Sequence, residues 1–197
     1  MNYKILDSES DRSSWSKVLS LFPDELQDIY FYPDYVGMHK FNQRTKSLMF
    51  TCEEKGNIWV HPFLLQSINL DELSFSDDPW FDIQSAYGYG GPLSNTCDQT
   101  FLDKANEQFS EWCRGNNVIA EFLRFHPIIE NEKWVSKSYY IEKQRDTLSI
   151  KPLHDEQQYL NPKVRNKIRR LNKLNIEINK VNIEKYFQPF VDIYHKN

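Results

Sequence analysis

Residues 47–65, SLMFTCEEKGNIWVHPFLL, decide the fold prediction. Every second residue from Leu48 to Cys52 is apolar, and residues 58–65 are rich in β-branched and aromatic side chains. The KGN tripeptide between the two runs supplies turn-forming residues. This stretch therefore predicts a β-hairpin.

Helices are predicted on both sides of the hairpin. Apolar residues within 15–22 recur at intervals of three and four, which indicates an amphipathic helix that Pro23 ends. A further helical turn or two is expected at 26–30, and Pro33 then opens a short segment at 34–39. After the hairpin, the spacing in 101–113 predicts a helix of about four turns, ended by a Gly-Asn pair.

The second half of the chain alternates strand and helix patterns. We expect a buried strand at 118–125, strands at 139–142, 147–150 and 176–178, a basic helix at 163–175, and a last helix at 186–194 that is broken or bent near Pro189. Asn161 and Pro162 form a helix-start signal before the basic helix.

Composition narrows the class of protein. The chain has 197 residues, 40% hydrophobic and 26% charged, which is typical of a folded protein with a real core. No apolar run approaches the roughly 20 residues that span a bilayer, and the N-terminus does not resemble a signal peptide, so a cytoplasmic protein without a transmembrane segment is expected. The three cysteines have no metal-ligand spacing, so we expect buried free thiols rather than a zinc site or disulfides.

Charge is distributed unevenly along the chain. The formal net charge is -4, yet the residues from Asn161 onward include nine basic and three acidic side chains. The C-terminal stretch is therefore net positive and the body strongly acidic. This asymmetry indicates an anionic ligand at the basic end.

A glycine-rich segment, SAYGYGGP at 85–92, contains half of the chain's six glycines, Gly88, Gly90 and Gly91. It fits neither the dinucleotide fingerprint nor the P-loop, which disfavours both classes of nucleotide enzyme. Two interpretations remain open. The glycines let the backbone approach a ligand beside Tyr87 and Tyr89, or they form a bulge and a tight turn.

The segment EFLRFHP at 121–127 places Arg124 and His126 at the end of a predicted strand, followed by Asn131. Strand ends often present ligand-binding groups. A structural role for these residues is the alternative. No nucleophile-and-base triad can be assembled around the histidines.

The predicted basic helix carries cations on two strips. Arg165, Lys167, Arg169 and Arg170 belong to a set of six cations over three turns, which repel one another unless an anion lies nearby. The phosphates of a nucleotide-linked substrate, of CoA or of tRNA would supply that anion. A solvated basic face is the alternative.

Taken in order, these segments resemble one family, the bacterial FemAB-type branch of the GNAT acyltransferase superfamily. The matching pieces are YPDYV at 32–36, SAYGYGGP at 85–92, EFLRFHP at 121–127 with Asn131, DTLSI at 146–150 and RNKIRR at 165–170. The resemblance extends over nearly the whole chain.

The resemblance implies an α/β fold of the α+β type, in which a GNAT-like mixed twisted sheet is flanked by helices. Residues 1–144 would form a first GNAT-like domain, and residues 145–197 the beginning of a second. The strands expected to bind the acyl donor have no counterpart in these residues, so as an N-terminal part the chain is expected to be inactive alone.

The activity that the resemblance implies is acyl or aminoacyl transfer to an amine or hydroxyl of a phosphate-bearing cell-wall or polysaccharide precursor. Acyl-CoA or aminoacyl-tRNA would be the co-substrate. No tightly bound cofactor, metal or DNA partner is expected. A non-catalytic binding module for a nucleotide-sugar, tRNA or partner protein is the alternative function.

Candidate site residues follow from the matching segments. No general base is assigned, although His126 is a candidate. The substrate-binding candidates are Tyr87, Tyr89, Gly90, Gly91, Arg124, Asn131, Arg165, Lys167, Arg169 and Arg170.

Overall fold

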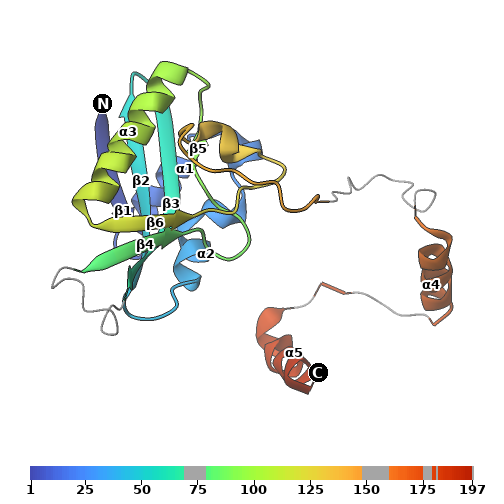
Figure 1. Ribbon diagram of the computed structural model, residues 1–197. Helices are drawn as coiled ribbons and strands as arrows, with labels where there is room; N and C mark the ends of the chain where they lie inside the picture. The colour runs from blue at the N-terminus through green and yellow to red at the C-terminus, as the bar shows by residue number, and fades with distance from the viewer. Residues whose placement is uncertain (69–78, 148–159, 175–178, 181, 197) are drawn as a thin grey trace. The chain divides into compact units, whose positions relative to one another are not determined.

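The computed structural model describes residues 1–68, 79–147, 160–174, 179–180 and 182–196 (Figure 1). The chain divides into two compact units, Met1–Asp146 and Thr147–Asn197. The first unit contains β1 (Asn2–Asp7), α1 (Arg12–Leu19), the 3-10 turns η1 (Asp24–Leu26) and η2 (Ile29–Phe31), α2 (Pro33–Met38), β2 (Thr45–Glu54), β3 (Asn57–Ile68), β4 (Trp80–Gln84), β5 (Leu93–Ser94), α3 (Gln99–Gly115), β6 (Val118–Phe122) and the 3-10 turn η3 (Asn131–Trp134). The second contains α4 (Pro162–Lys173) and α5 (Ile183–Lys196).

A mixed six-stranded sheet forms the centre of the first unit. Its order is β1-β2-β3-β4-β6, with β5 paired to β3. Neighbouring strands are antiparallel except for β4 and β6, which are parallel. The predicted hairpin is confirmed as β2 and β3, and its turn uses the left-handed backbone of Lys55 and Gly56, with φ of 54° and 85°. The protein therefore has an α+β fold.

Helices cover both faces of the sheet. Helix α3 lies on one face, and α1 and α2 lie on the other (Figure 1). The predicted helix at 101–113 is confirmed within α3, which the Asp98 carboxylate caps by accepting the backbone N–H groups of Thr100 and Phe101. The helical turns expected at 26–30 are also present, as 3-10 turns, and the short segment at 34–39 lies mostly in α2.

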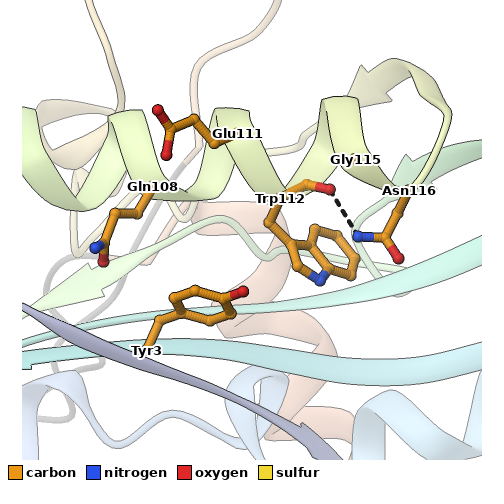
Figure 2. Close-up of a pocket in the computed structure, with 6 residues that line it drawn as sticks. All are labelled: Tyr3, Gln108, Glu111, Trp112, Gly115 and Asn116. Atoms are coloured by element: carbon orange, nitrogen blue, oxygen red, sulfur yellow. Dashed lines mark hydrogen bonds between the residues drawn. The ribbon is translucent and has the colours of Figure 1, made fainter.

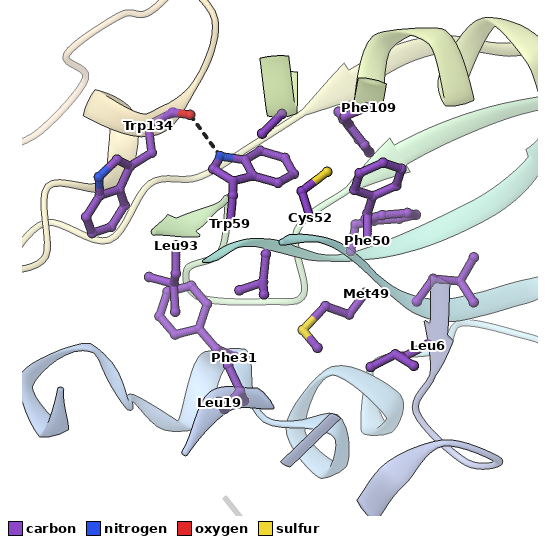
Figure 3. Close-up of a cluster of buried hydrophobic side chains, with 14 of the residues drawn as sticks. Leu6, Leu19, Phe31, Met49, Phe50, Cys52, Trp59, Leu93, Phe109 and Trp134 are labelled. Carbon is purple, nitrogen blue, oxygen red and sulfur yellow. Dashed lines mark hydrogen bonds between the residues drawn. The ribbon is translucent and has the colours of Figure 1, made fainter. Parts of the chain in front are cut away.

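The core has an aromatic layer beneath α3. Figure 3 shows Phe109 of α3 directed toward the sheet beside Phe50 and Trp59, with Leu19 and Phe31 on the opposite side of the strands. The Phe109 ring centroid lies 5.3 Å from that of Phe50, 5.9 Å from Trp59, 4.9 Å from His61, 5.8 Å from Phe63 and 6.0 Å from Trp112. Phe109 thus joins α3 to both strands of the hairpin.

Two strand predictions need correction. The strand predicted at 118–125 is present as β6, but it ends at Phe122 and lies at the edge of the sheet. Its predicted burial is wrong, because Ile119 and Phe122 are exposed. Residues 139–142 form no strand, and they follow a turn at 136–139 in which the Tyr139 N–H donates to the Ser136 carbonyl. Of the strand predicted at 147–150, residues 148–150 lie outside the described residues, as do the strand predicted at 176–178 and Asn175 of the basic helix.

The second unit presents two helices without buried residues. Helix α4 begins at the predicted signal, since the Asn161 side chain accepts the Lys163 N–H. Helix α5 continues through Pro189, so the last helix is not broken there, and the alternative of a bend stays a prediction. No helix among the described residues has the length and apolar character that crossing a bilayer requires.

Truncation of Phe109, the central ring of the aromatic layer, should cause a large loss of stability. We expect Phe109→Ala to lower the free energy of unfolding by about 3 to 5 kcal/mol, because it leaves a cavity between α3 and the hairpin. Glu107→Ala, at an exposed position of the same helix, is the control and should change stability by less than about 0.5 kcal/mol. Urea unfolding of both variants measures the difference, and equal midpoints would show that Phe109 does not hold α3 in place.

Candidate functional site

Three tyrosines, one histidine and one carboxylate from separate segments meet in the first unit. We call this group the tyrosine site, and it consists of Asp28, Tyr30, Tyr35, Tyr89 and His126. Tyr30 of η2 is central, with ring centroids 5.0 Å from Tyr35, 5.2 Å from Tyr89 and 5.8 Å from His126. The rings of Tyr89 and His126 lie 5.2 Å apart. The site therefore joins the η2–α2 region, the glycine-rich segment and the chain that follows β6.

The hydrogen bonds of His126 fix its tautomer. Its Nδ1 accepts the backbone N–H groups of Ile128 and Ile129, at 3.3 and 3.2 Å. The ring proton must therefore reside on Nε2, which lies 3.5 Å from Oδ2 of Asp28. Neither ring nitrogen is left with a free lone pair.

Burial keeps His126 neutral near pH 7. It lowers the pKa of His126 below its ordinary value, and the neighbouring Asp28 carboxylate opposes this shift more weakly. A neutral imidazole whose acceptor nitrogen is occupied cannot take a proton from a substrate. His126, the candidate base of the sequence analysis, is thus better suited to orient Asp28 than to act as a base itself.

Asp28 is held from two sides and still reaches solvent. Its Oδ1 accepts the Tyr30 N–H at 3.3 Å, as the cap of η2. Its side chain is 37% exposed. Burial raises the pKa of Tyr35, with further contributions from neighbouring tyrosines and Asp28. A carboxylate beside neutral tyrosines can bind a cationic group and accept its proton.

The glycine-rich segment is packed tightly against the tyrosine site. Gly88 has φ of +99°, and a Cβ there would lie 2.4 Å from the Tyr30 ring. A Cβ on Gly90 would lie 2.6 Å from the Ser85 Cβ. Gly91 has φ of +93° and would place a Cβ 3.0 Å from the Asn131 amide nitrogen. Close approach to the protein's own side chains explains these glycines.

Asn131 binds the backbone on both sides of the site. It is fully buried, and its Nδ2 donates to the carbonyls of Gly90 and Pro92 at 2.8 and 3.0 Å. Its Oδ1 accepts the His126 N–H at 2.7 Å. With the amide engaged in this way, Asn131 shapes the site through the backbone.

The remaining candidates lie in different places. Tyr87 is exposed, and its carbonyl accepts the Tyr35 hydroxyl at 2.9 Å. Arg124 is exposed, and its backbone bonds to Ser85 and Gly90. The four basic candidates belong to α4, in the second unit. The structure thus brings Tyr89, Gly90, Gly91, His126 and Asn131 together.

Sequence reasoning missed Asp28 and Tyr30 altogether. The available signal was the run DIYFYPDY at 28–35, in which an acid precedes closely spaced aromatics. It also missed the contacts of a second acid, Glu121, whose side chain is 13% exposed. Glu121 accepts Nε2–H of His61 at 2.6 Å and the hydroxyl of Tyr139, while Nδ1 of His61 is buried with no partner among the described residues.

A hollow of about 230 Å³ lies between β1 and α3 and shares no residue with the tyrosine site (Figure 2). Tyr3, Gln108, Glu111, Trp112, Gly115 and Asn116 line it. Its amides are used internally, because Gln108 contacts Cys52 and the Met1 carbonyl and Asn116 donates to the Trp112 carbonyl. It offers fewer reactive groups than the tyrosine site.

We also searched the described part of the chain for metal-ligand groups and reactive thiols. No three His, Cys, Asp or Glu side chains gather there to hold a metal ion. Burial raises the pKa values of Cys52 and Cys113 to about 12. All three thiols are free, but only Cys52 is buried. Cys113 is partly buried and Cys97 is exposed, so the expectation of three buried thiols is wrong for these two residues.

No protein-family model, curated protein or solved structure matches this chain. The functional argument therefore depends on the geometry of the tyrosine site and on the residues themselves.

Because these glycines are closely packed, we expect that adding even one methyl group will destabilise the fold. We expect Gly90→Ala and Gly91→Ala to cost about 1 to 3 kcal/mol each, and thus several degrees of melting temperature. Gly115→Ala is the control, because a Cβ there meets no atom within 4 Å. Melting within about 1 °C of the parent for both variants would refute the close packing.

His126 predicts a specific pH dependence of stability. Because its folded-state pKa lies below the ordinary value of about 6.5, its contribution is present above that pH and is lost as the pH falls below it. His126→Gln should destabilise by about 1 to 3 kcal/mol at pH 7.5, where the Ile129 N–H loses its acceptor. The difference in free energy of unfolding between parent and variant should be smaller at pH 5.5 than at pH 7.5. Urea unfolding at both pH values measures it, and an unchanged difference would contradict this role of His126.

Proposed function

We propose that this chain belongs to an acyl- or aminoacyltransferase of the FemAB type, which acts on a phosphate-bearing cell-wall or polysaccharide precursor, and that the tyrosine site receives the acceptor. The observation that carries the proposal is the Asp28 carboxylate, partly exposed and held beside a buried neutral His126 among three tyrosines. The mixed sheet flanked by helices supports it, since this is the architecture that the sequence resemblance implied.

Acyl transfer to an amine requires a group at this site that removes a proton from the acceptor. An acceptor amine arrives as an ammonium and must lose a proton before its nitrogen attacks the acyl carbonyl carbon, after which the bond from that carbon to the thiol or tRNA hydroxyl breaks. Asp28 is suited to hold the ammonium and accept that proton, with the tyrosine rings favouring the cation. His126 keeps the carboxylate in place by donating from Nε2.

The phosphates of the precursor need separate contacts. Arg165, Lys167, Arg169 and Arg170 of α4 are the proposed groups, because arginine and lysine form charge-assisted bonds with phosphate oxygens. The acyl donor, acyl-CoA or aminoacyl-tRNA, is assigned to no described residue.

A binding module for a nucleotide-sugar, tRNA or partner protein is the second candidate. It is favoured by the occupied ring nitrogens of His126, which leave no free imidazole for catalysis. A module of this kind has no need of an acceptor amine. It should therefore bind ligands with a free and a blocked amine equally well.

Acceptor binding tests the proposal directly. The probe is a UDP-sugar that carries a peptide with one free lysine amine, and the matched ligand has that amine acetylated. We expect Asp28→Asn to weaken binding of the free amine roughly tenfold or more, because a charge-assisted bond contributes about 1.5 to 3 kcal/mol. Isothermal titration calorimetry measures the dissociation constants.

Asp34→Asn is the control for loss of one carboxylate, since Asp34 lies on the adjacent α2 in an exposed pair with Arg12. It should bind like the parent. Equal affinity of the parent for the free and acetylated ligands would remove the acceptor role of the tyrosine site and favour the binding module.

A further inference from the structure

Helix α4 combines an exposed apolar stripe with cations on both of its sides. Val164, Ile168 and Leu171 recur at intervals of four and three and so share one face. Val164 is 42% exposed and Leu171 50% exposed. The cations that flank this stripe are Lys163, Lys167 and Arg170 on one side and Arg165 and Arg169 on the other, and Lys173 lies opposite the stripe.

The charge on α4 has one sign only. From Pro162 to Lys173 the helix contains six basic residues and no acidic one. Like charges at spacings of three and four destabilise a helix in water, so a surface of many negative groups would favour this one. The cations lie on two separate strips, which one phosphate group cannot contact together.

We propose that α4 lies on the surface of an anionic lipid bilayer, with its apolar stripe at the boundary of headgroups and acyl chains and its flanking cations on lipid phosphates. The observations for this are the juxtaposition of stripe and cations and their complementarity to such a surface. Long lysine and arginine stems allow the charged groups to reach headgroups while the stripe is buried. The proposal concerns α4 alone. It places on lipid phosphates the same cations that the proposed function assigns to the precursor, and it leaves the acceptor role of the tyrosine site unaffected.

Other ligands and the other helix fit this pattern less well. A soluble nucleotide or a tRNA offers phosphates but no apolar medium, so it would leave Val164 and Leu171 in water. Helix α5 also has an exposed aromatic face, but its polar side mixes Glu184 and Asp192 with its basic residues. Complementarity to an anionic surface is therefore specific to α4.

Vesicle binding by the full 197-residue chain tests the proposal. The probes are vesicles of phosphatidylcholine alone and of phosphatidylcholine with about a quarter phosphatidylglycerol, separated by flotation. We expect binding to the anionic vesicles only, weakened by added salt because screening acts over about 8 Å at physiological ionic strength. Inorganic phosphate and UDP, at matched ionic strength, should not displace the protein.

Paired variants separate lipid docking from simple phosphate contact. The double variant Lys167→Gln and Arg170→Gln should lower the partition coefficient about 25-fold, roughly fivefold for each cation. Lys17→Gln with Lys137→Gln, which removes two exposed cations of the first unit, is the control and should bind like the parent. Val164→Ser with Leu171→Ser should reduce partitioning about tenfold or more without changing net charge.

Three results would overturn the proposal. One is equal binding to neutral and anionic vesicles. Another is loss of binding in the cation variant but full binding in the stripe variant, which would assign α4 to phosphate contact without a membrane. The third is loss of binding in Phe190→Ser of α5 while both α4 variants bind normally.

Discussion

The side-chain amide of Asn131 fixes the arrangement on which the tyrosine site depends. It bonds three backbone groups, at Gly90, Pro92 and His126, and is fully buried. An amide in that position must keep its partners, because a buried polar group without them costs about 1 to 3 kcal/mol. The glycine-rich segment and the chain beyond β6 are therefore held at one separation, and Gly91 has no side chain because that amide occupies the space.

The position of Asp28 also depends on the Asn131 amide, because His126 links the two residues. The His126 backbone is bonded to Asn131, and its ring is held by the N–H groups that follow it, so Nε2 points in one direction. Asp28 lies in that direction at the start of a single 3-10 turn. A short turn fixes a side chain poorly by itself, so contacts from a distant part of the chain set the position of the carboxylate.

These dependencies explain what the sequence could predict. Local patterns located the hairpin, α3 and the start of α4, because periodicity, turns and caps act between near neighbours. The edge position of β6 was missed, because apolar residues at 118–122 have the same pattern in a central and an edge strand. Asp28 was missed because its role comes from a contact with His126, and no spacing rule links residues so far apart. The glycines at 90 and 91 were identified as special, but their reason required the positions of Ser85 and Asn131.

The described residues of the first unit include two carboxylate–histidine pairs, and their surroundings differ. Glu121 has both oxygens engaged, by His61 and by Tyr139, and its side chain is 13% exposed. A carboxylate held by two side-chain bonds in this way joins β3, β6 and the chain after η3, and little of it is open to a ligand. Asp28 has one backbone bond at 3.3 Å and a long contact of 3.5 Å to His126, and more than a third of its side chain is exposed. Because its hydrogen-bonding capacity is only partly used and solvent can reach it, Asp28 is the more accessible of the two carboxylates, which is why the acceptor is proposed to bind there.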